Sequence, residues 1–388
     1  MKISVISDTH FGYKWNEERG RDAFRNAREA FERSQDSDLI IMPGDVFDRK
    51  IPKQEVLDEA TDVFSLAMEG ERRVETEDSL DIHGDGTPVL AIHGTHERRP
   101  REYTNPIELM DRAGLLEHLD NQRKVFKKNG EKVAVFGLSG VPERYAKKAL
   151  EKLDPEPVED AFNILVLHQS VEGFVYTPEE DYLSLEDFPE GFDLIVNGHI
   201  HWYNLERFGD SIPFILPGST ITTQMNKVEA EKQKGFLKLD TQEEQLEFCE
   251  LESAREVHYV EIEVDGEPWS EVKKKAVDRL EEINPDRKPL VNLKIDGETE
   301  GRVNPRELRK RFRDRIFLNI NTSIDSISPE NTQKSFEEES DPWQEGKKIL
   351  AEKVNSDLEV EDELLEILEK GKPEEAVELL KKEVKDQE

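Results

Sequence analysis

The chain has 388 residues, enough for two or three domains, and its hydrophobic fraction of 35% supports a packed core. The formal charge of −34 excludes general nucleic-acid binding except through local basic patches, and it is typical of proteins that work in concentrated salt. The single cysteine, Cys249, excludes an intrachain disulfide and a cysteine metal cluster, and the absence of a signal-like start or a long apolar run predicts a cytoplasmic protein with no membrane contact.

Short apolar runs predict a series of buried strands separated by amphipathic helices. The predicted strands cover residues 3–7, 39–42, 88–92, 132–138, 163–167, 194–197 and 212–215, with a closing hairpin of 235–239 and 245–251. The predicted helices cover residues 19–33, 53–69 and 107–119. Strands that are almost entirely apolar are covered on both faces, so we expect an α/β fold with helices or a second sheet over each face.

Possible metal ligands follow the carboxyl ends of several of these strands, where α/β sheets bind their ligands. The residues in these positions are Asp8, His10, Asp45, Thr95, His96, His168, His199 and His201. Since residues at i and i+2 of an extended segment share one side, we expect His199 and His201 to present their rings to one spot. The alternative is a surface loop that happens to contain two histidines, but five of the nine histidines lie at strand ends.

Aspartate and histidine without cysteine predict a mixed oxygen–nitrogen site that takes Mn²⁺, Fe²⁺, Zn²⁺ or Co²⁺ more readily than Ca²⁺. Asp45 is well placed to bridge two ions. A two-metal site clamps the attacking and leaving oxygens of an in-line displacement, which indicates phosphate-ester hydrolysis by an activated water.

The pattern of predicted strands and helices changes near residue 253. A βαβαβ pattern predicts a small α/β cap domain over residues 253–324, after a first domain of residues 1–252. A Ser-, Glu- and Pro-containing linker of residues 325–343 follows, and then a tail of short amphipathic helices over residues 344–388. Helices this short either pack on the body or dock into the groove of a partner.

The ordered motifs Asp8-x-His10, Gly44-Asp45, Gly94-x-His96-Glu97, His168 and Gly198-His199-x-His201 resemble the calcineurin-like metallophosphoesterase superfamily over residues 1 to about 250. Within it, the chain looks most like the SbcD/Mre-eleven DNA double-strand-break repair nucleases, in the archaeal form. The resemblance implies a two-sheet metallophosphoesterase sandwich flanked by helices. It implies two Mn²⁺ ions, one held by Asp8, His10, Asp45 and His201 and the other by Asp45, His168 and His199, with His96 beside the scissile phosphate as acid or transition-state contact.

One motif departs from this family, because Thr95 stands where the family has asparagine. The second ion could be held by the Thr95 hydroxyl, through water, or less tightly. His93 could also help, since it precedes Thr95 by two residues.

Two basic segments could bind DNA phosphates without reading sequence. They contain Arg98, Arg99 and Arg101 beside the third motif, and Arg309 and Arg313 in the segment from 302 to 315. The alternative for both is a solvated face that balances nearby acids. The resemblance further implies a homodimer, with candidate faces at 56–67 and 107–119, and an SbcC/Rad-fifty-type coiled-coil ATPase partner bound by the tail.

These observations predict a Mn²⁺-dependent DNA exonuclease and endonuclease that processes double-strand break ends with the ATPase. The rival hypotheses are a phosphodiesterase for small nucleotides and a catalytically weak scaffold subunit. Thr95 favours the scaffold, whereas the cap, the arginines and the tail favour the nuclease.

Overall fold

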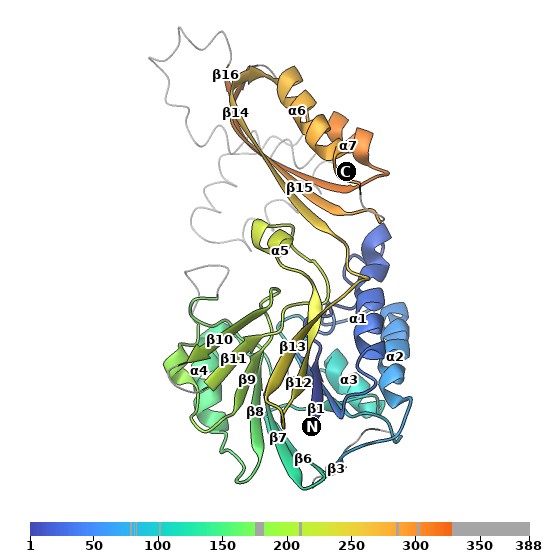
Figure 1. Ribbon diagram of the computed structural model, residues 1–388, viewed down its shortest axis with the longest axis vertical. Coiled ribbons are helices and arrows are strands. Elements are labelled where there is room, and N and C mark those ends of the chain that lie inside the picture. Colours follow the sequence, from blue (N-terminus) through green and yellow to red (C-terminus); the bar gives the residue numbers. More distant parts are fainter. Residues whose placement is uncertain are drawn as a thin grey trace, which may run out of the picture. The chain divides into compact units, whose positions relative to one another are not determined.

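The computed structural model describes residues 1–77, 80, 82, 84–100, 102–174, 182–208, 212–284, 287–300 and 303–327 (Figure 1). Residues 1–326 cluster as one compact unit. The predicted tail and most of the predicted linker lie outside the described residues. Within the described ranges, no helix is long and apolar enough to cross a membrane. The proposed division into domains 1–252 and 253–324 stays a prediction.

The first sheet has six strands in the order β13-β12-β1-β2-β4-β5. Its strands are β1 (Lys2–Val5), β2 (Leu39–Pro43), β4 (Val89–Ile92), β5 (Glu117–His118), β12 (Gly235–Asp240) and β13 (Gln245–Glu250). Neighbouring pairs from β1 to β5 are parallel, so the carboxyl ends of these strands share one edge of the sheet.

The second sheet has seven strands in the order β10-β11-β9-β8-β7-β6-β3. Its strands are β3 (Glu75–Thr76), β6 (Gln122–Lys128), β7 (Glu131–Leu138), β8 (Phe162–Leu167), β9 (Leu194–Asn197), β10 (Asn204–Phe208) and β11 (Ile212–Leu216). The central strands β7, β8 and β9 are parallel to one another.

The two sheets pack face to face, and helices cover their outer faces. The helices of this part are η1 (Glu18–Arg21), α1 (Asp22–Glu32), α2 (Gln54–Met68), α3 (Pro106–Arg112), α4 (Glu143–Leu153), η2 (Leu185–Asp187) and α5 (Lys227–Glu231). Ile3 and Ile41 of the first sheet meet Val135 and Val166 of the second in one buried cluster. Helices α1–α3 lie on the outer face of the first sheet and α4 on that of the second, which confirms the predicted sandwich (Figure 1).

A third sheet follows the sandwich, in the order β14-β15-β16. Its elements are β14 (Val257–Pro268), α6 (Trp269–Glu281), β15 (Leu290–Glu300), α7 (Arg306–Phe312) and β16 (Phe317–Ile327), as the βαβαβ pattern predicted. Its core is separate, with Val272, Leu293 and Leu308 buried together. Arg255 and Arg287, which flank β14 and β15, both contact the buried Asp22 carboxylate at 2.6 Å. The third sheet is therefore tied to the amino end of α1.

Several expected elements differ from the structure. The helix predicted over residues 107–119 is wrong beyond Arg112, because Gly114 takes a positive φ of 74° and the chain then forms β5 beside β4. Strands β6 and β10 and helix α4 were not predicted.

The predicted dimer faces are also largely wrong as free surfaces. Most of the apolar residues within the candidate faces, residues 56–67 and 107–119, are buried inside the chain's own core: Val56, Ala60, Val63, Phe64, Ala67, Met110 and Leu116. Leu109 and Ala113 remain exposed.

Candidate metal centre

The predicted site residues follow the carboxyl ends of strands from both sheets. Asp8 and His10 follow β1, Asp45 follows β2, and His96 follows β4. His168 follows β8 of the second sheet, and His199 and His201 follow β9. The structure brings their donor atoms together in groups of three, at the edge where the two packed sheets present parallel strand ends.

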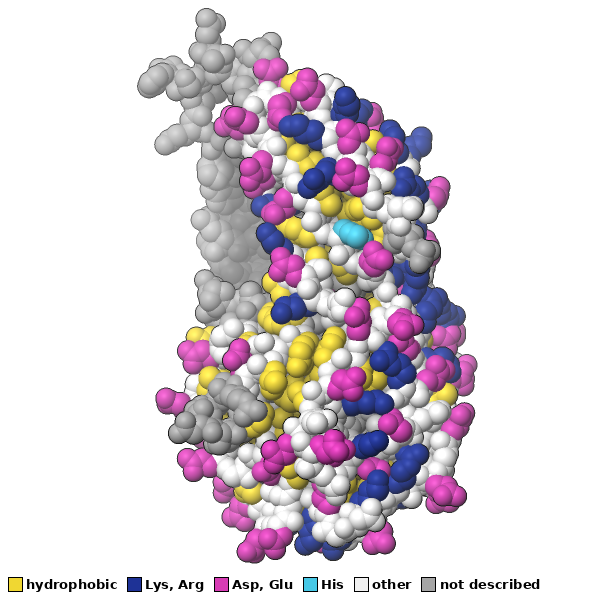
Figure 2. Space-filling model, in the orientation of Figure 1, with side chains coloured by type: hydrophobic (Ala, Val, Ile, Leu, Met, Phe, Trp, Pro, Cys, Tyr) yellow, Lys and Arg dark blue, Asp and Glu magenta, His cyan; other side chains and the backbone are white. Residues whose placement is uncertain are grey.

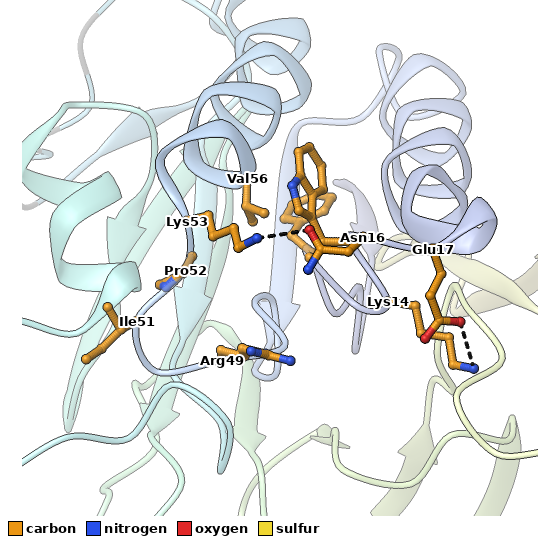
Figure 3. Close-up of a pocket in the computed structure, with 11 residues that line it drawn as sticks. Lys14, Asn16, Glu17, Arg49, Ile51, Pro52, Lys53 and Val56 are labelled. Carbon is orange, nitrogen blue, oxygen red and sulfur yellow. Dashed lines mark hydrogen bonds and ion pairs between the residues drawn. The ribbon is translucent and has the colours of Figure 1, made fainter.

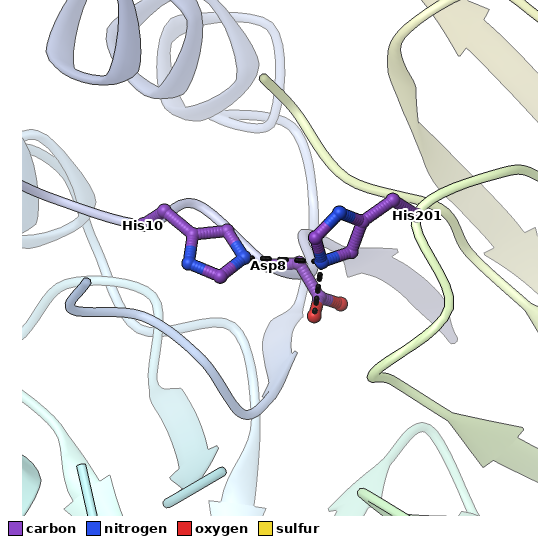
Figure 4. Close-up of side chains that lie close together, drawn as sticks. All are labelled: Asp8, His10 and His201. Atoms are coloured by element: carbon purple, nitrogen blue, oxygen red, sulfur yellow. Dashed lines mark hydrogen bonds and ion pairs between the residues drawn. The ribbon is translucent and has the colours of Figure 1, made fainter. Parts of the chain in front are cut away.

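The first group consists of Asp8, His10 and His201 (Figure 4). The Nε2 atoms of the two histidines lie 3.2 Å apart, and His201 Nε2 is 3.7 Å from Asp8 Oδ1. Asp8 and His10 both take a left-handed backbone, with φ of 48° and 46°, which turns the loop after β1 back into the site. Burial raises the pKa of Asp8 and lowers that of His10 well below its usual value.

The second group consists of Asp45, His168 and His199. His168 Nε2 lies 3.2 Å from Asp45 Oδ2, while its Nδ1 donates to the Pro43 carbonyl at 2.7 Å, which directs Nε2 into the group. Burial alone would lower the pKa of His168, but the Asp45 carboxylate outweighs it and raises the pKa to about 10. Burial and the neighbouring His168 lower the pKa of His199 to about 3.

These side chains suit divalent transition-metal ions. Two buried ring nitrogens make no hydrogen bond among the described residues: His168 Nε2, which lies 3.2 Å from Asp45 Oδ2, and His10 Nδ1, which lies 3.8 Å from Asp48 Oδ1. Buried polar atoms are normally satisfied, so such atoms beside carboxylates indicate a missing electrophile. Imidazole nitrogen with carboxylate oxygen is the donor set of Mn²⁺, Fe²⁺ and Zn²⁺ rather than of Ca²⁺.

The prediction that His199 and His201 face one spot is wrong. His199 belongs to the group of Asp45 and His201 to the group of Asp8. The segment is not extended at this point, because His199 has a φ of 75°. The left-handed residue redirects the chain, so the two rings serve neighbouring groups instead of one.

Thr95 lies at Asp45, where its Oγ1 is 3.2 Å and 3.4 Å from the two carboxylate oxygens. Its role as a metal ligand stays a prediction. The alternative that His93 helps in place of the missing asparagine stays a prediction; its Nδ1 lies 3.1 Å from His118 Nε2, in a different group of side chains.

His96 differs from the buried histidines because 42% of its side chain is exposed. Its Nδ1 donates to the Asp48 carbonyl at 2.9 Å, and its Nε2 lies 3.9 Å from Asp45 Oδ2. Burial lowers its pKa, but Asp45 and Asp48 together outweigh burial and raise it. The ring therefore borders the second group while remaining accessible to a substrate.

Sequence reasoning gave no role to Glu97, a buried carboxylate that joins two motifs. It accepts hydrogen bonds from Phe47 N and Gly94 N, each at 2.7 Å, and so links the loops after β2 and β4. Burial and the Asp45 charge raise its pKa to about 8. The sequence signal that could have identified Glu97 was its position directly after His96.

A buried ion pair behind His201 was also missed. Lys234 Nζ contacts Glu229 Oε2 at 3.0 Å and donates to the His201 carbonyl at 2.7 Å. Glu229 Oε1 lies 3.6 Å from His201 Nδ1, and Thr223 Oγ1 lies 2.8 Å from the same nitrogen. No local sequence pattern marks these residues, which only the tertiary fold brings to the histidine.

The structure leaves the predicted DNA-binding arginines on the surface. Arg98 and Arg99 are partly exposed, and Arg99 donates to the Thr104 carbonyl at 2.9 Å. Arg309 and Arg313, at α7, are exposed. Arg101 lies outside the described residues. On the face that Figure 2 shows, basic side chains are interspersed with acidic ones rather than gathered in one patch.

A pocket of about 150 Å³ lies between the segments that start at Phe11 and Arg49 (Figure 3). Its walls come from the loops that follow His10 and Asp48, and they carry three cationic side chains, Lys14, Arg49 and Lys53. Lys53 Nζ donates to Asn16 Oδ1 at 2.9 Å and Lys14 pairs with Glu17 at 3.3 Å. Glu17 also lines the pocket and balances Lys14, so the remaining cations, Arg49 and Lys53, favour an anionic occupant.

Comparison with known proteins gives two findings. Residues 1–203 match the calcineurin-like phosphoesterase family. The chain is also similar to proteins named DNA double-strand break repair protein Mre11, with 28% identity to that of Methanopyrus kandleri over 72% of this chain and 26% to that of Thermoplasma acidophilum over 76%. The similarity spans 63% of the Methanopyrus protein and 76% of the Thermoplasma protein. A double-strand break repair protein of Macaca fascicularis is 24% identical over 76% of this chain and 50% of its own length.

Proposed function

Since the chain belongs to the calcineurin-like phosphoesterase family, we propose that it is a Mn²⁺-dependent DNA exonuclease and endonuclease that processes double-strand break ends. Similarity to named proteins supports the substrate class, and the grouped side chains support metal-dependent hydrolysis. The similarity to proteins named for double-strand break repair extends over 72–76% of the chain, beyond the phosphoesterase match. The observation that carries the proposal is the pair of neighbouring groups, each with one aspartate and two histidines.

Two divalent ions fit these groups. Asp8, His10 and His201, with Asp45 shared, would hold one ion, and Asp45, His168 and His199 would hold the other, with Thr95 beside Asp45. When bound, the ions would activate a water and neutralise charge on the phosphodiester. The chain itself would hold these ligands in place. Glu97 links the loop of Asp45 to the loop of His96 through hydrogen bonds to Phe47 N and Gly94 N, and Lys234 donates a hydrogen bond to the His201 carbonyl.

His96 would act on the substrate directly. Its Nδ1 proton is committed to the Asp48 carbonyl, so the ring keeps a fixed orientation and its Nε2 stays accessible beside Asp45. A protonated Nε2 could donate to the leaving oxygen or contact the phosphate in the transition state. The neighbouring carboxylates favour that protonated form, because they raise the pKa of the ring.

Local basic side chains would bring DNA to this acidic protein. Arg98 and Arg99 directly follow the loop that carries His96, and the pocket with Lys14, Arg49 and Lys53 begins directly after His10 and Asp48. Arg309 and Arg313 would add contacts from the third sheet. Such contacts hold the phosphate backbone in register without reading bases.

We further propose a homodimer that works with an SbcC/Rad-fifty-type ATPase bound through residues 344–388. The support is the similarity to Mre11 proteins and the amphipathic pattern of the tail, which lies outside the described residues. Deleting residues 344–388 should abolish binding of the ATPase and leave Mn²⁺-dependent nuclease activity in place.

The test is Mn²⁺-dependent degradation of a labelled DNA hairpin across a salt series, with wild type, His96→Ala and the control His258→Ala, which alters a histidine of β14 beside Glu256. Degradation by wild type and control but not by His96→Ala supports the nuclease. Turnover of a small phosphodiester without DNA degradation would support the small-nucleotide hypothesis. Turnover of neither by folded, metal-loaded protein with the ATPase present would support the scaffold and assign the loss to Thr95.

A further inference from the structure

A further group of side chains, here called the third group, repeats the composition of the groups in the candidate centre but shares no residue with them, unlike the group of His10, Asp48 and His96, which shares His10 with the first group. It consists of His93, His118 and Asp120, whose donor atoms all lie within 4.8 Å of one another. His93 follows β4, whereas His118 ends β5 and Asp120 comes two residues later. Two histidines and one aspartate again converge from neighbouring parallel strands, on side chains that the proposed nuclease mechanism does not use.

The spacing of the two rings fits a shared ion. Two nitrogens that each lie 2.0–2.1 Å from a tetrahedral Zn²⁺ are about 3.4 Å apart. His93 Nδ1 and His118 Nε2 are 3.1 Å apart. The corresponding pair in the first group, His10 and His201, is 3.2 Å apart, so the third group has nearly the same separation as a pair already placed in a candidate metal site.

The backbone on both sides of this group is fixed before any ion binds. His118 N donates to Asp111 Oδ1 at 3.0 Å, inside the short strand β5. His93 N lies 3.4 Å from Ser139 Oγ, and Gly140 N donates to the His93 carbonyl at 2.7 Å. Ligands held on anchored backbone lose little conformational freedom when they close on an ion.

We propose that His93, His118 and Asp120 form a third divalent metal site, selective for Zn²⁺ or a similar borderline ion over Mg²⁺. Two imidazoles and one carboxylate leave a fourth position for water, whereas Mg²⁺ prefers six oxygen ligands. Asp120 is exposed and His93 is only partly buried, so this site exchanges its ion more readily than the buried pair does. Because His93 precedes Thr95 by two residues, the ion clamps the start of the loop that also carries His96.

The first test counts ions. Metal-stripped protein is dialysed against Zn²⁺ alone and the bound zinc is measured by mass spectrometry. We expect three ions per chain for wild type and for the control His258→Ala, and two for His118→Phe, which keeps a ring without nitrogens. Asp120→Asn, at an exposed position where folding is not at risk, should weaken the third ion at least about 10-fold.

The second test isolates the third site. In a His10→Ala/His199→Ala background, which removes one ligand from each buried group, Co²⁺ should still give the visible absorption of a tetrahedral nitrogen–oxygen site. Adding His118→Phe should abolish that absorption. Equal zinc counts for wild type, His118→Phe and Asp120→Asn would overturn the proposal and leave a hydrogen bond between two imidazoles in its place. Displacement of the third ion by millimolar Mg²⁺ would overturn its selectivity.

Discussion

The buried groups around Asp8 and Asp45 and the edge group around His93 have the same composition but differ in burial. His10 and His168 are 1% and 0% exposed, and each has a ring nitrogen without a hydrogen-bond partner among the described residues. In the edge group the two rings contact each other and Asp120 reaches solvent. A buried ring nitrogen without a hydrogen-bond partner in the protein gains the most free energy when it binds an ion. Burial, rather than residue type, should therefore decide which ions are held most tightly.

The largest effect should come from Asp45→Asn. Asp45 contacts His168 in one group and lies beside His96 and Thr95, so the substitution weakens the second group and any ion that the two groups share. Loss of several kcal/mol of transition-state stabilisation corresponds to roughly a 10³–10⁴-fold fall in the rate of DNA hydrolysis. Single-turnover rates with saturating Mn²⁺ would measure it. A variant within about 10-fold of wild type would contradict the central role of Asp45.

His96→Ala should cost less, about 10²–10³-fold in rate, because it removes a proton donor but no predicted ligand. Bound metal, measured after dialysis, should stay at the wild-type level. A loss of bound metal in this variant would instead identify His96 as a ligand. The donor atoms of His10, Asp48 and His96 also lie close enough together to hold an ion, so this outcome is a specific alternative.

Glu97→Gln should change how stability depends on pH in the metal-free protein. The folded pKa of Glu97 is about 8 against an ordinary value of 4.5, so its protonated form is favoured by folding. The stability it contributes is fully present below about pH 4.5 and is lost as the pH rises through about 8. Chemical denaturation from pH 5 to 8 should show the free energy of unfolding of wild type falling relative to that of Glu97→Gln, because the histidines with lowered pKa values, such as His10 and His199, contribute equally to both proteins. Parallel profiles would show that Glu97 is not the group responsible.

The smallest effect should come from Arg309→Glu with Arg313→Glu. Both residues are exposed, so the change should leave stability intact while weakening DNA affinity by about 3- to 10-fold and reducing the salt dependence of binding by about two phosphate contacts. Fluorescence anisotropy over a salt series would measure both. Unchanged affinity would mean that these arginines only balance neighbouring acids such as Glu281, the partner of Arg311.

The sequence determined the parts of this protein that local patterns encode. Apolar runs such as 39–42 and 163–167 marked buried strands, and Asp45 and His168 at their ends marked a site. The βαβαβ pattern of residues 253–324 predicted the strands and helices of the third sheet in their order along the chain. These predictions hold because strand burial and strand-end placement depend on neighbouring residues alone.

Only the tertiary structure decided which side chains belong to which candidate metal-binding group. The positive φ of His199 sends it and His201 to different groups, and no spacing rule predicts that turn. Lys234 and Glu229 reach His201 from a distant segment. His93 groups with His118 because β5 pairs with β4 and brings His118 beside it. Each of these outcomes depends on contacts between segments far apart in the chain, which local patterns of residues do not contain.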